Sequence, residues 1–235
     1  MRIRDLNWMQ LEAYLARDDR IVLPIGSTEQ HAYLSLETDN LLAEGVAVEA
    51  AEPLGVPVLP VLAYGLTPTF AAYPGSPSLR LATLVAVVQD LLESLRRQGF
   101  RRIMVVNGHG GNLPARAAVR EWVGDHPDAQ ALFHSWFNGP KVWAVVADID
   151  SAAGHASWME NFPLTRLDGV ALPEEAKSPV DMAGFEAAGP ADVRRGLGDG
   201  SYGGLYARPD EDVLRIWRAG VEEVRNLLEN GWRRG

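Results

Sequence analysis

Two carboxylates and an imidazole stand close together just after the first apolar run of the chain. The run is RIVLPI (20–25), and the segment that follows it, GSTEQHAYLSLETDN (26–40), carries Glu29, His31 and Asp39. The side chains of His, Asp and Glu are common ligands of zinc, manganese and iron in proteins. The segment is therefore either an ordinary polar loop or one part of a metal site, and the rest of the chain must decide.

A second polar motif, NGHGGN (107–112), follows another apolar run, IMVV (103–106). Parallel strands end at one edge of a sheet, so His109 can join the three residues above although it is distant in sequence. The neighbouring glycines let the backbone turn sharply and leave space for a substrate, and Asn112 is a candidate cap of the next helix. The alternative, a phosphate-binding loop, lacks the G-x-G-x-x-G spacing and the lysine of known phosphate loops.

A third motif, GHASWMENF (154–162), offers another imidazole and another carboxylate. His155 and Glu160 are five residues apart, so on a regular helix they would not share a face. They can reach one centre if His155 precedes the helix and Glu160 lies on its inner side. Each of them alone is as easily a surface or capping residue.

The elements that must position these motifs alternate along the chain. Short apolar runs predict buried strands, and longer segments with apolar residues at helical spacing predict helices. Prolines in 56–65 indicate a sheet edge or strand ends there. Strand–helix alternation favours an α/β fold with a parallel sheet. Strands are predicted at 20–26, 56–65, 101–108 and 129–137, and helices at 40–51, 82–98, 112–123 and 210–230.

The stretch 163–205 shows little periodicity, and its later part is rich in Gly and Asp. We expect long loops there that cover a site or an interface, rather than a second domain. A length of 235 residues suits a single domain spanning 1–235. His126 and His134 are expected to be structural, one near a helix end and the other in an apolar strand.

Composition excludes several classes of protein. The net charge of −9 argues against a nucleic-acid binder, because phosphate contacts need clustered Lys and Arg. The chain has no cysteine, so any metal must be held by His, Asp and Glu. No apolar run is long enough to span a membrane, and no signal-peptide pattern follows Met1. A cytoplasmic protein without membrane or nucleic-acid partners is therefore expected.

Four stretches in this order resemble the creatininase (creatinine amidohydrolase) family: LPIGSTEQHAYLSLETD, YPGSPSL (73–79), VVNGHGGN and GHASWMEN. The resemblance covers most of residues 17–162. It implies a three-layer αβα fold with a mainly parallel sheet and a centre of two divalent metal ions. It also implies hydrolysis of a C–N bond in a small-molecule amide, and a homo-oligomer that is often a hexamer in this family.

The resemblance also implies roles for particular residues. Glu29 and His109 look like ligands of one metal ion, which would be zinc, manganese or iron. His31 would hold the other ion and Asp39 would bridge the two. Glu160 falls on the glutamate of the family's HAGxxET stretch and would complete the second ion's ligands.

Residues near the substrate follow from the same resemblance. His155 is similar to the histidine of that stretch and is a candidate proton shuttle or substrate contact. Ser76 lies in a turn that the family places near the substrate, although a plain Pro-Gly turn is an equal alternative. Gly110 would leave room for the substrate. Trp158, with Trp136 and Trp143, could wall a flat ligand, although tryptophan is more often a core residue.

The chain departs from the family pattern in two places. The family commonly has EQHGPHLP and an Asp eleven positions after the Glu, whereas EQHAYLSLETD is one residue shorter and lacks the second histidine. Glu37 therefore competes with Asp39 for the bridging position. Creatininase itself has Tyr and Glu after its NGH and a Glu before the later histidine, where this chain has glycines at 110, 111 and 154. Creatinine is therefore not the expected substrate.

Charge arithmetic supports a hydrolytic centre. Three carboxylates against two divalent ions leave one positive charge, which favours deprotonation of a water at the site. The expected reaction is attack on a linear or cyclic amide, with His155 passing a proton to the leaving nitrogen. Two alternatives remain: a non-catalytic or regulatory metal-binding relative, which the shortened loop favours, and a nucleotide-binding protein that uses GHGGN.

Overall fold

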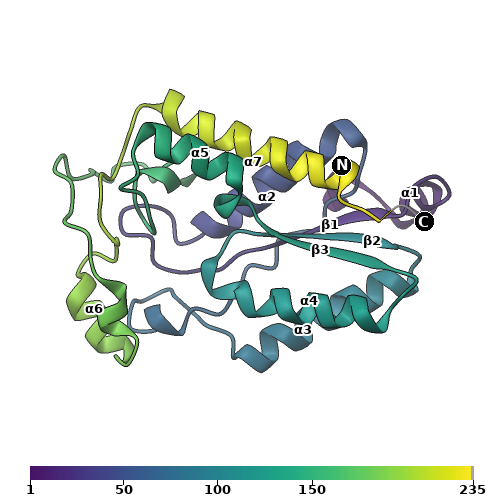
Figure 1. The fold of residues 1–235 in the computed structure, drawn as a ribbon, viewed down its shortest axis with the longest axis horizontal. Helices are drawn as coiled ribbons and strands as arrows, with labels where there is room; N and C mark the ends of the chain where they lie inside the picture. Colours follow the sequence, from purple (N-terminus) through teal and green to yellow (C-terminus); the bar gives the residue numbers. More distant parts are fainter. Residues whose placement is uncertain (234–235) are drawn as a thin grey trace.

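The computed structural model describes residues 1–233 and contains a parallel sheet of three strands. The strands β1 (Arg20–Ile25), β2 (Arg102–Asn107) and β3 (Gln130–Ser135) lie side by side in this order. Ile21 pairs with Ile103, and Ile103 pairs with Ala131. Because the strands are parallel, their carboxyl ends share one edge of the sheet, on the left in Figure 1.

Helices cover both faces of the sheet (Figure 1). One face carries α2 (Thr38–Ala51), α5 (Pro140–Ile149) and α7 (Asp210–Asn230). The other face carries α3 (Leu81–Arg97) and α4 (Leu113–Asp125). The predicted α/β fold with three layers and a parallel sheet is confirmed.

The strands supply both cores because their side chains alternate between the two faces. Val22 and Met104 pack in the core under α2, α5 and α7, whereas Ile21, Leu23 and Ile103 pack in the core above α3 and α4. The apolar runs have no polar alternation because both faces of the sheet are covered. Polar side chains follow the carboxyl ends of β1 and β2, where the candidate site lies.

The segment 56–65 differs from the predicted strand. It runs parallel to β1 and forms bridges there, from Val58 to Val22 and from Leu62 to Ile25. Pro57 and Pro60 have no N–H to donate, so the ladder is interrupted and no continuous strand forms. The prediction of a sheet-edge position was right, and the prediction of a regular strand was wrong.

Three helices were not predicted: α1 (Trp8–Leu15), α5 and the short α6 (Pro190–Leu197). The last of these lies within 163–205, which otherwise lacks long regular elements as expected. Val193 and Leu197 of α6 pack with Phe70 and Tyr73 in a small separate core. The stretch therefore has its own packing and extends beyond the carboxyl ends of the strands (Figure 1).

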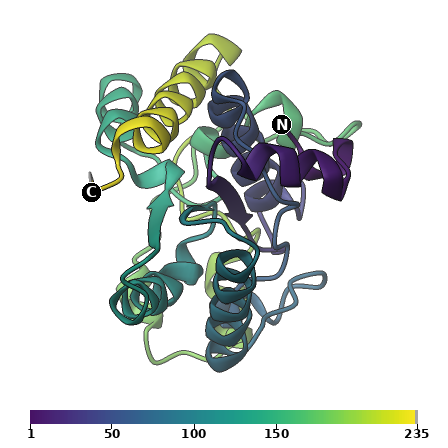
Figure 2. The same cartoon turned by 90° about the vertical axis from the view of Figure 1, so that its right-hand side faces the viewer.

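β3 is the edge strand on the side away from β1, and Figure 2 shows no further strand beside it. All six of its residues are half-buried, in contrast to β1 and β2, where five of six are buried. Among the helices of residues 1–233, none has the length and apolar character needed to cross a membrane.

Candidate metal centre

The first two polar motifs meet at the carboxyl edge of the sheet. Glu29 and His31 lie in the loop that follows β1, and Asp39 lies in the first turn of α2. His109 lies two residues after the end of β2. All four side chains are buried, although each is polar or charged. Burial of this kind is costly unless the groups are paired or hold a cation.

Two asparagines fix the turn that carries His109. Asn107 donates from Nδ2 to the carbonyl oxygen of His109 at 2.7 Å. Asn112 donates from Nδ2 to the carbonyl of Gly26 at 2.9 Å and accepts from the N–H of Leu66 at 3.1 Å. Asn112 does not cap α4 with its side chain, contrary to the prediction. It instead ties the ends of neighbouring segments together, because its amide is fully buried between them.

Glu29, Asp39 and His109 form one group with metal-ligand geometry. His109 Nδ1 lies 3.0 Å from Asp39 Oδ2 and 3.3 Å from Glu29 Oε1. Ligand atoms of the three residues lie within 4.8 Å of one another. The group contains one imidazole and two carboxylates, a ligand set that zinc, manganese and iron accept.

A second group of the same kind contains His31, Asp39 and Glu160. His31 Nε2 lies 3.2 Å from Asp39 Oδ1 and 3.7 Å from Glu160 Oε2. Glu160 ends the short 3-10 helix Trp158–Glu160, and His155 precedes that helix. Asp39 thus contributes one oxygen to each group and lies between them. Glu37, the competing carboxylate, is exposed at the start of α2.

The imidazoles are held so that one nitrogen of each faces the carboxylates. His31 Nδ1 lies 3.2 Å from the carbonyl oxygen of Glu29, and His109 Nε2 lies 3.0 Å from the carbonyl oxygen of Leu66. An N–H donated to each carbonyl leaves the lone pair of the other nitrogen available to a metal ion. Such backbone contacts orient histidine ligands in known metal sites.

Two of the buried polar atoms at the centre lack hydrogen-bond partners. His31 Nε2 and Asp39 Oδ2 have none among the described residues, although oppositely charged groups are close. Buried polar atoms are nearly always satisfied in native proteins, so two adjacent exceptions need a cause. Lone pairs that converge without a hydrogen between them suit a bound cation, and the residues present therefore fit divalent metal ions.

The electrostatics of the ion-free centre show the same need for positive charge. Burial lowers the pKa of His31, but Asp39 and Glu160 outweigh it and raise that pKa to about 10. The pKa of His109 is also well above its usual value, because Asp39 and Glu29 outweigh burial. Burial and the Asp39 carboxylate outweigh the His31 charge and raise the pKa of Glu160 to about 7. In this state protons neutralise carboxylates that metal ions would otherwise neutralise.

His155 forms a third group of this kind with Glu29 and His31, but its ring has a different environment. Its Nδ1 is 3.8 Å from Glu29 Oε1, and its ring lies against Phe70 and Tyr202 at centroid distances of 4.7 and 5.0 Å. Burial and the nearby charge of His31 hold its pKa well below the usual value, so the ring is neutral. A neutral imidazole that faces the centre can accept a proton or contact a ligand.

Gln30 holds His155 in place, a role that no sequence motif predicted. Its side-chain nitrogen lies 2.8 Å from His155 Nε2 and donates to the carbonyl oxygen of Gly200 at 3.2 Å. Its side-chain oxygen accepts from the N–H of Ala32 at 3.1 Å. Gly200 belongs to the Gly-rich part of 163–205, where a Cβ would clash with the Gln30 side chain. The stretch 163–205 therefore covers the site, which is one of the two roles predicted for it.

A cavity of about 290 Å³ opens above the centre. Its floor includes His155 and all three residues of the first group, and its walls are largely apolar and aromatic: Phe70, Phe137, Trp143, Met159 and Tyr202. Neither Lys nor Arg lines it. Gly110 borders the cavity, and a Cβ there would meet open space. The aromatic wall was not predicted, apart from Trp143, because its members come from distant segments without a shared motif.

Two residues predicted to contact a substrate lie elsewhere. Trp158 is fully buried in the core under α7 and donates from its indole nitrogen to the carbonyl of Ala152. Trp136 is likewise a core residue. Ser76 is buried and accepts from the N–H of Gln30 at 2.9 Å, so it supports the loop that carries the ligands. Neither Trp158 nor Ser76 borders the cavity, and their side chains stabilise its surroundings instead.

The chain is similar to several known proteins. A family model described as creatininase, creatinine amidohydrolase, matches residues 4–227. A creatinine amidohydrolase from Pseudomonas putida is 37% identical over 117 residues, which are 47% of this chain and 45% of that protein. A mycofactocin precursor peptide peptidase from Mycobacterium ulcerans (strain Agy99) is 31% identical over 194 residues, 70% of this chain and 74% of that one. The chain thus spans about half the length of the first of these relatives.

Solved structures extend the likeness over the full chain. A mutant creatininase of type II superposes with a TM-score of 0.78 at 25% identity and covers 99% of both chains. Two further creatininases with the same fold are described as a Zn-Zn type and as a manganese form.

Proposed function

The chain belongs to the creatininase family of hydrolases, and from this premise we propose that it cleaves a C–N bond of an amide with two divalent metal ions. One observation carries the proposal. The Asp39 carboxylate lies between two groups of buried ligands, with one oxygen 3.0 Å from His109 and the other 3.2 Å from His31. A surface loop or a single-ion site would not need a buried carboxylate shared in this way.

The chain's own residues would hold both ions. Glu29 and His109 would bind one, His31 and Glu160 the other, and Asp39 both. Zinc, manganese and iron all accept such a ligand set. Bound ions of this kind polarise a carbonyl oxygen and lower the pKa of water.

His155 is proposed as the catalytic residue that contacts the reacting atoms. Gln30 holds its Nε2 from the side away from the centre, so that Nδ1 faces Glu29. Nδ1 is the ring nitrogen that faces Glu29, so it is the atom that would accept a proton and pass it to the leaving nitrogen. Phe70 and Tyr202 pack against the ring and exclude water from that side.

The cavity indicates the kind of amide. Its aromatic and apolar walls suit a small, uncharged substrate whose flat or apolar part lies against Trp143 and Phe137. Gly110, Gly111 and Gly154 line the cavity where creatininase itself has acidic or phenolic side chains by the resemblance described above. A linear or cyclic amide other than creatinine is the proposed substrate class. Assembly as a homo-oligomer remains a prediction from the family resemblance.

A non-catalytic metal-binding relative is the alternative, because the loop after His31 is shortened. That loop still places Glu29, His31 and Asp39 together, with Ala32 in the left-handed region at φ 51°. The alternative predicts bound metal without turnover of any amide.

Metal content and turnover test the proposal together. We would purify the protein without chelator, measure zinc, manganese and iron by elemental mass spectrometry, and compare His109→Ala with His126→Ala. The control residue His126 stacks on Trp122 at the end of α4, away from the ligands. We expect about two ions per chain in the wild type and in the control, and a loss in His109→Ala.

The same preparations would be screened against cyclic amides, carboxamides and short peptides for release of an amine. Turnover that follows metal content supports the hydrolase. Metal without turnover supports the binding relative. A folded protein that stays empty after addition of zinc, manganese or iron would refute both.

A further inference from the structure

The outer edge of β3 has unpaired backbone groups. Gln130 donates its N–H to the carbonyl of Arg101, so the residues at 130, 132 and 134 face β2. The N–H and C=O groups of Ala131, Phe133 and Ser135 therefore point away from the sheet, and none has a hydrogen-bond partner among residues 1–233. A strand of six residues spans about 20 Å, which is long enough for another strand to pair with it.

A groove with positive charge runs beside this edge. It has a volume of about 580 Å³ and lies between α4 and β3. Val119, Val123 and Phe133 contribute apolar surface, and Arg116, Arg120 and Arg233 contribute charge, whereas no acidic residue lines it. The two arginines of α4 are four residues apart and exposed on one face of the helix.

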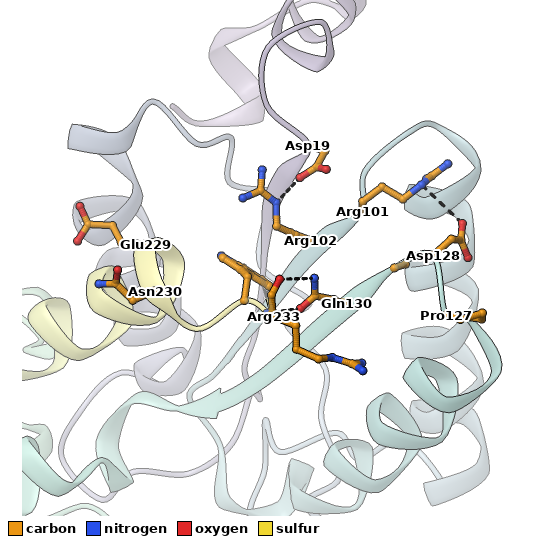
Figure 3. A pocket seen from close by; sticks show the side chains of 11 residues that line it. Asp19, Arg101, Arg102, Pro127, Asp128, Gln130, Glu229, Asn230 and Arg233 are labelled. Atoms are coloured by element: carbon orange, nitrogen blue, oxygen red, sulfur yellow. Dashed lines mark hydrogen bonds and ion pairs between the residues drawn. The ribbon is translucent and has the colours of Figure 1, made fainter. Parts of the chain in front are cut away.

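The arginines of the groove differ from those of the neighbouring pocket. Figure 3 shows that pocket at the amino end of the sheet, where Arg102 pairs with Asp19 and Arg101 with Asp128. In the groove, neither Arg116 nor Arg120 lies within ion-pair distance of a carboxylate in the described chain. Arg116 and Arg120 are thus cations without acidic partners in the described chain, on a protein whose net charge is −9.

We propose that this groove binds an extended acidic segment of a partner protein, which adds as a strand to the edge of β3. Ala131 and Phe133 direct their side chains toward the core of α3 and α4, so residues paired opposite them lie on the α4 side. Acidic side chains at every second position of the segment meet Arg116 and Arg120. Apolar side chains at the alternate positions face Leu132 on the other side of the sheet. Strand addition of this type draws affinity from the backbone and specificity from alternate side chains.

Two other occupants fit less well. A second copy paired antiparallel at this edge would bring α4 next to its own counterpart, so that Arg116 and Arg120 would face like charges. A nucleic acid would complement the arginines, but it would leave the backbone edge of β3 unpaired, and the acidic remainder of the protein would repel it.

The experiment uses the full-length protein and a fluorescein-labelled peptide, acetyl-(Glu-Val)4-amide, with binding measured by fluorescence anisotropy. Acetyl-(Lys-Val)4-amide reverses the charge, and acetyl-(Glu-Pro)4-amide keeps the charge but removes half of the N–H donors. The variant is Arg116→Ala/Arg120→Ala, and the control variant is Arg218→Ala, an exposed arginine on α7. Hydrogen exchange of the β3 amides is measured with and without the acidic peptide.

We expect the acidic peptide to bind at least tenfold more tightly than either comparison peptide. Its affinity should fall at least tenfold in Arg116→Ala/Arg120→Ala and stay unchanged in Arg218→Ala. Exchange at Ala131, Phe133 and Ser135 should slow when it binds, with no change in metal content. Equal binding of the peptides, or binding without protection of these amides, would overturn the proposal. So would a dimer that protects the same amides without peptide, or tighter binding of a single-stranded oligothymidine.

Discussion

The two ends of the sheet carry similar numbers of charged residues but arrange them differently. At the amino end, Asp18 accepts hydrogen bonds from Arg20 and Arg102 at 3.0 Å, so acid and base satisfy one another. At the carboxyl end, Asp39 lies between His31 and His109 at similar distances, yet its Oδ2 and the Nε2 of His31 have no hydrogen-bond partner. Acidic and basic side chains pair with one another at the amino end, whereas at the carboxyl end ligand atoms converge in a geometry that fits metal ions.

The comparison shows which observation identifies a metal centre. The density of charge does not, because the amino end is at least as rich in charged groups (Figure 3). Unsatisfied buried atoms do so only where they converge with carboxylates and imidazoles from other motifs, as those of His31 and Asp39 do. Variants at the two ends of the sheet can test whether these ends differ in function as they do in hydrogen bonding.

The largest effect is expected at the shared ligand. Asp39→Ala should lose both metal ions, because each group of ligands loses a carboxylate, and amide hydrolysis should fall by at least about a hundredfold, since loss of residues that merely support ligands costs up to that much. Elemental mass spectrometry and an amide-hydrolysis assay measure both effects. Glu37→Ala, two residues away and exposed, is the matched control. If Asp39→Ala kept its full metal content and full turnover, Asp39 would not be the shared ligand.

The next largest effect is expected in the pH dependence of stability, which should depend on the carboxyl end of the sheet. In the metal-free protein the pKa of His31 is raised from 6.5 to about 10, so its stabilising contribution is full below pH 6.5 and is lost as the pH rises toward 10. The melting temperature of metal-free protein should therefore fall between pH 6 and pH 8.5. Added zinc should raise it more at pH 8.5, because fewer protons must leave. His31→Gln should flatten the pH dependence, and an unchanged slope in that variant would contradict the assignment.

Disruption of the amino end should change stability alone. Asp18→Ala removes hydrogen bonds to Arg20 and Arg102, and charge-assisted bonds of this kind contribute about 1.5–3 kcal/mol. Urea unfolding should show a loss of that order in the free energy of unfolding. Metal content and turnover should remain those of the wild type. A loss of metal in Asp18→Ala would show that the two ends of the sheet are coupled and do not differ in function.

The smallest effect concerns the turn after His31. Ala32 has φ 51°, in the left-handed region that glycine adopts without strain. Ala32→Gly should raise the free energy of unfolding by about 0.5 kcal/mol, because relief of about 1–2 kcal/mol of strain exceeds the added entropy of the unfolded chain. Urea unfolding measures the change, with Ala117→Gly on exposed α4 as a destabilised control. A loss of stability at Ala32 would show that its methyl group has a packing role.

Much of the fold followed from local sequence signals. The apolar runs gave all three strands within two residues of their ends, because a sheet covered on both faces needs continuous apolar segments. The segment 56–65 was predicted less well, since two prolines interrupt its ladder while the rest of its pattern suits a strand. α5 was missed because its residues 142–147 are all apolar and show no helical period, and its N-cap makes no side-chain hydrogen bond.

The candidate site was likewise predictable from the sequence only in part. Motif spacing and the family resemblance led to Glu29, His31, Asp39, His109 and Glu160, which the structure gathers into two groups. Tertiary packing determined the rest: Trp158 satisfies its indole inside the core, and Ser76 supports Gln30. Gln30 itself contacts His155 across 125 positions of sequence, a distance at which no local pattern carries information.

The last helix of the chain has a consequence for how the protein is made. α7 packs closely on α2, where a Cβ at Gly45 would lie 2.6 Å from the Trp217 ring, and Arg225 donates to the carbonyl of Glu49 at 3.0 Å. α2 is the helix that presents Asp39, and α7 is synthesised long after it. During synthesis Asp39 therefore sits on a helix whose apolar face is uncovered until α7 has emerged, and we expect metal capture to follow that step rather than to guide early folding.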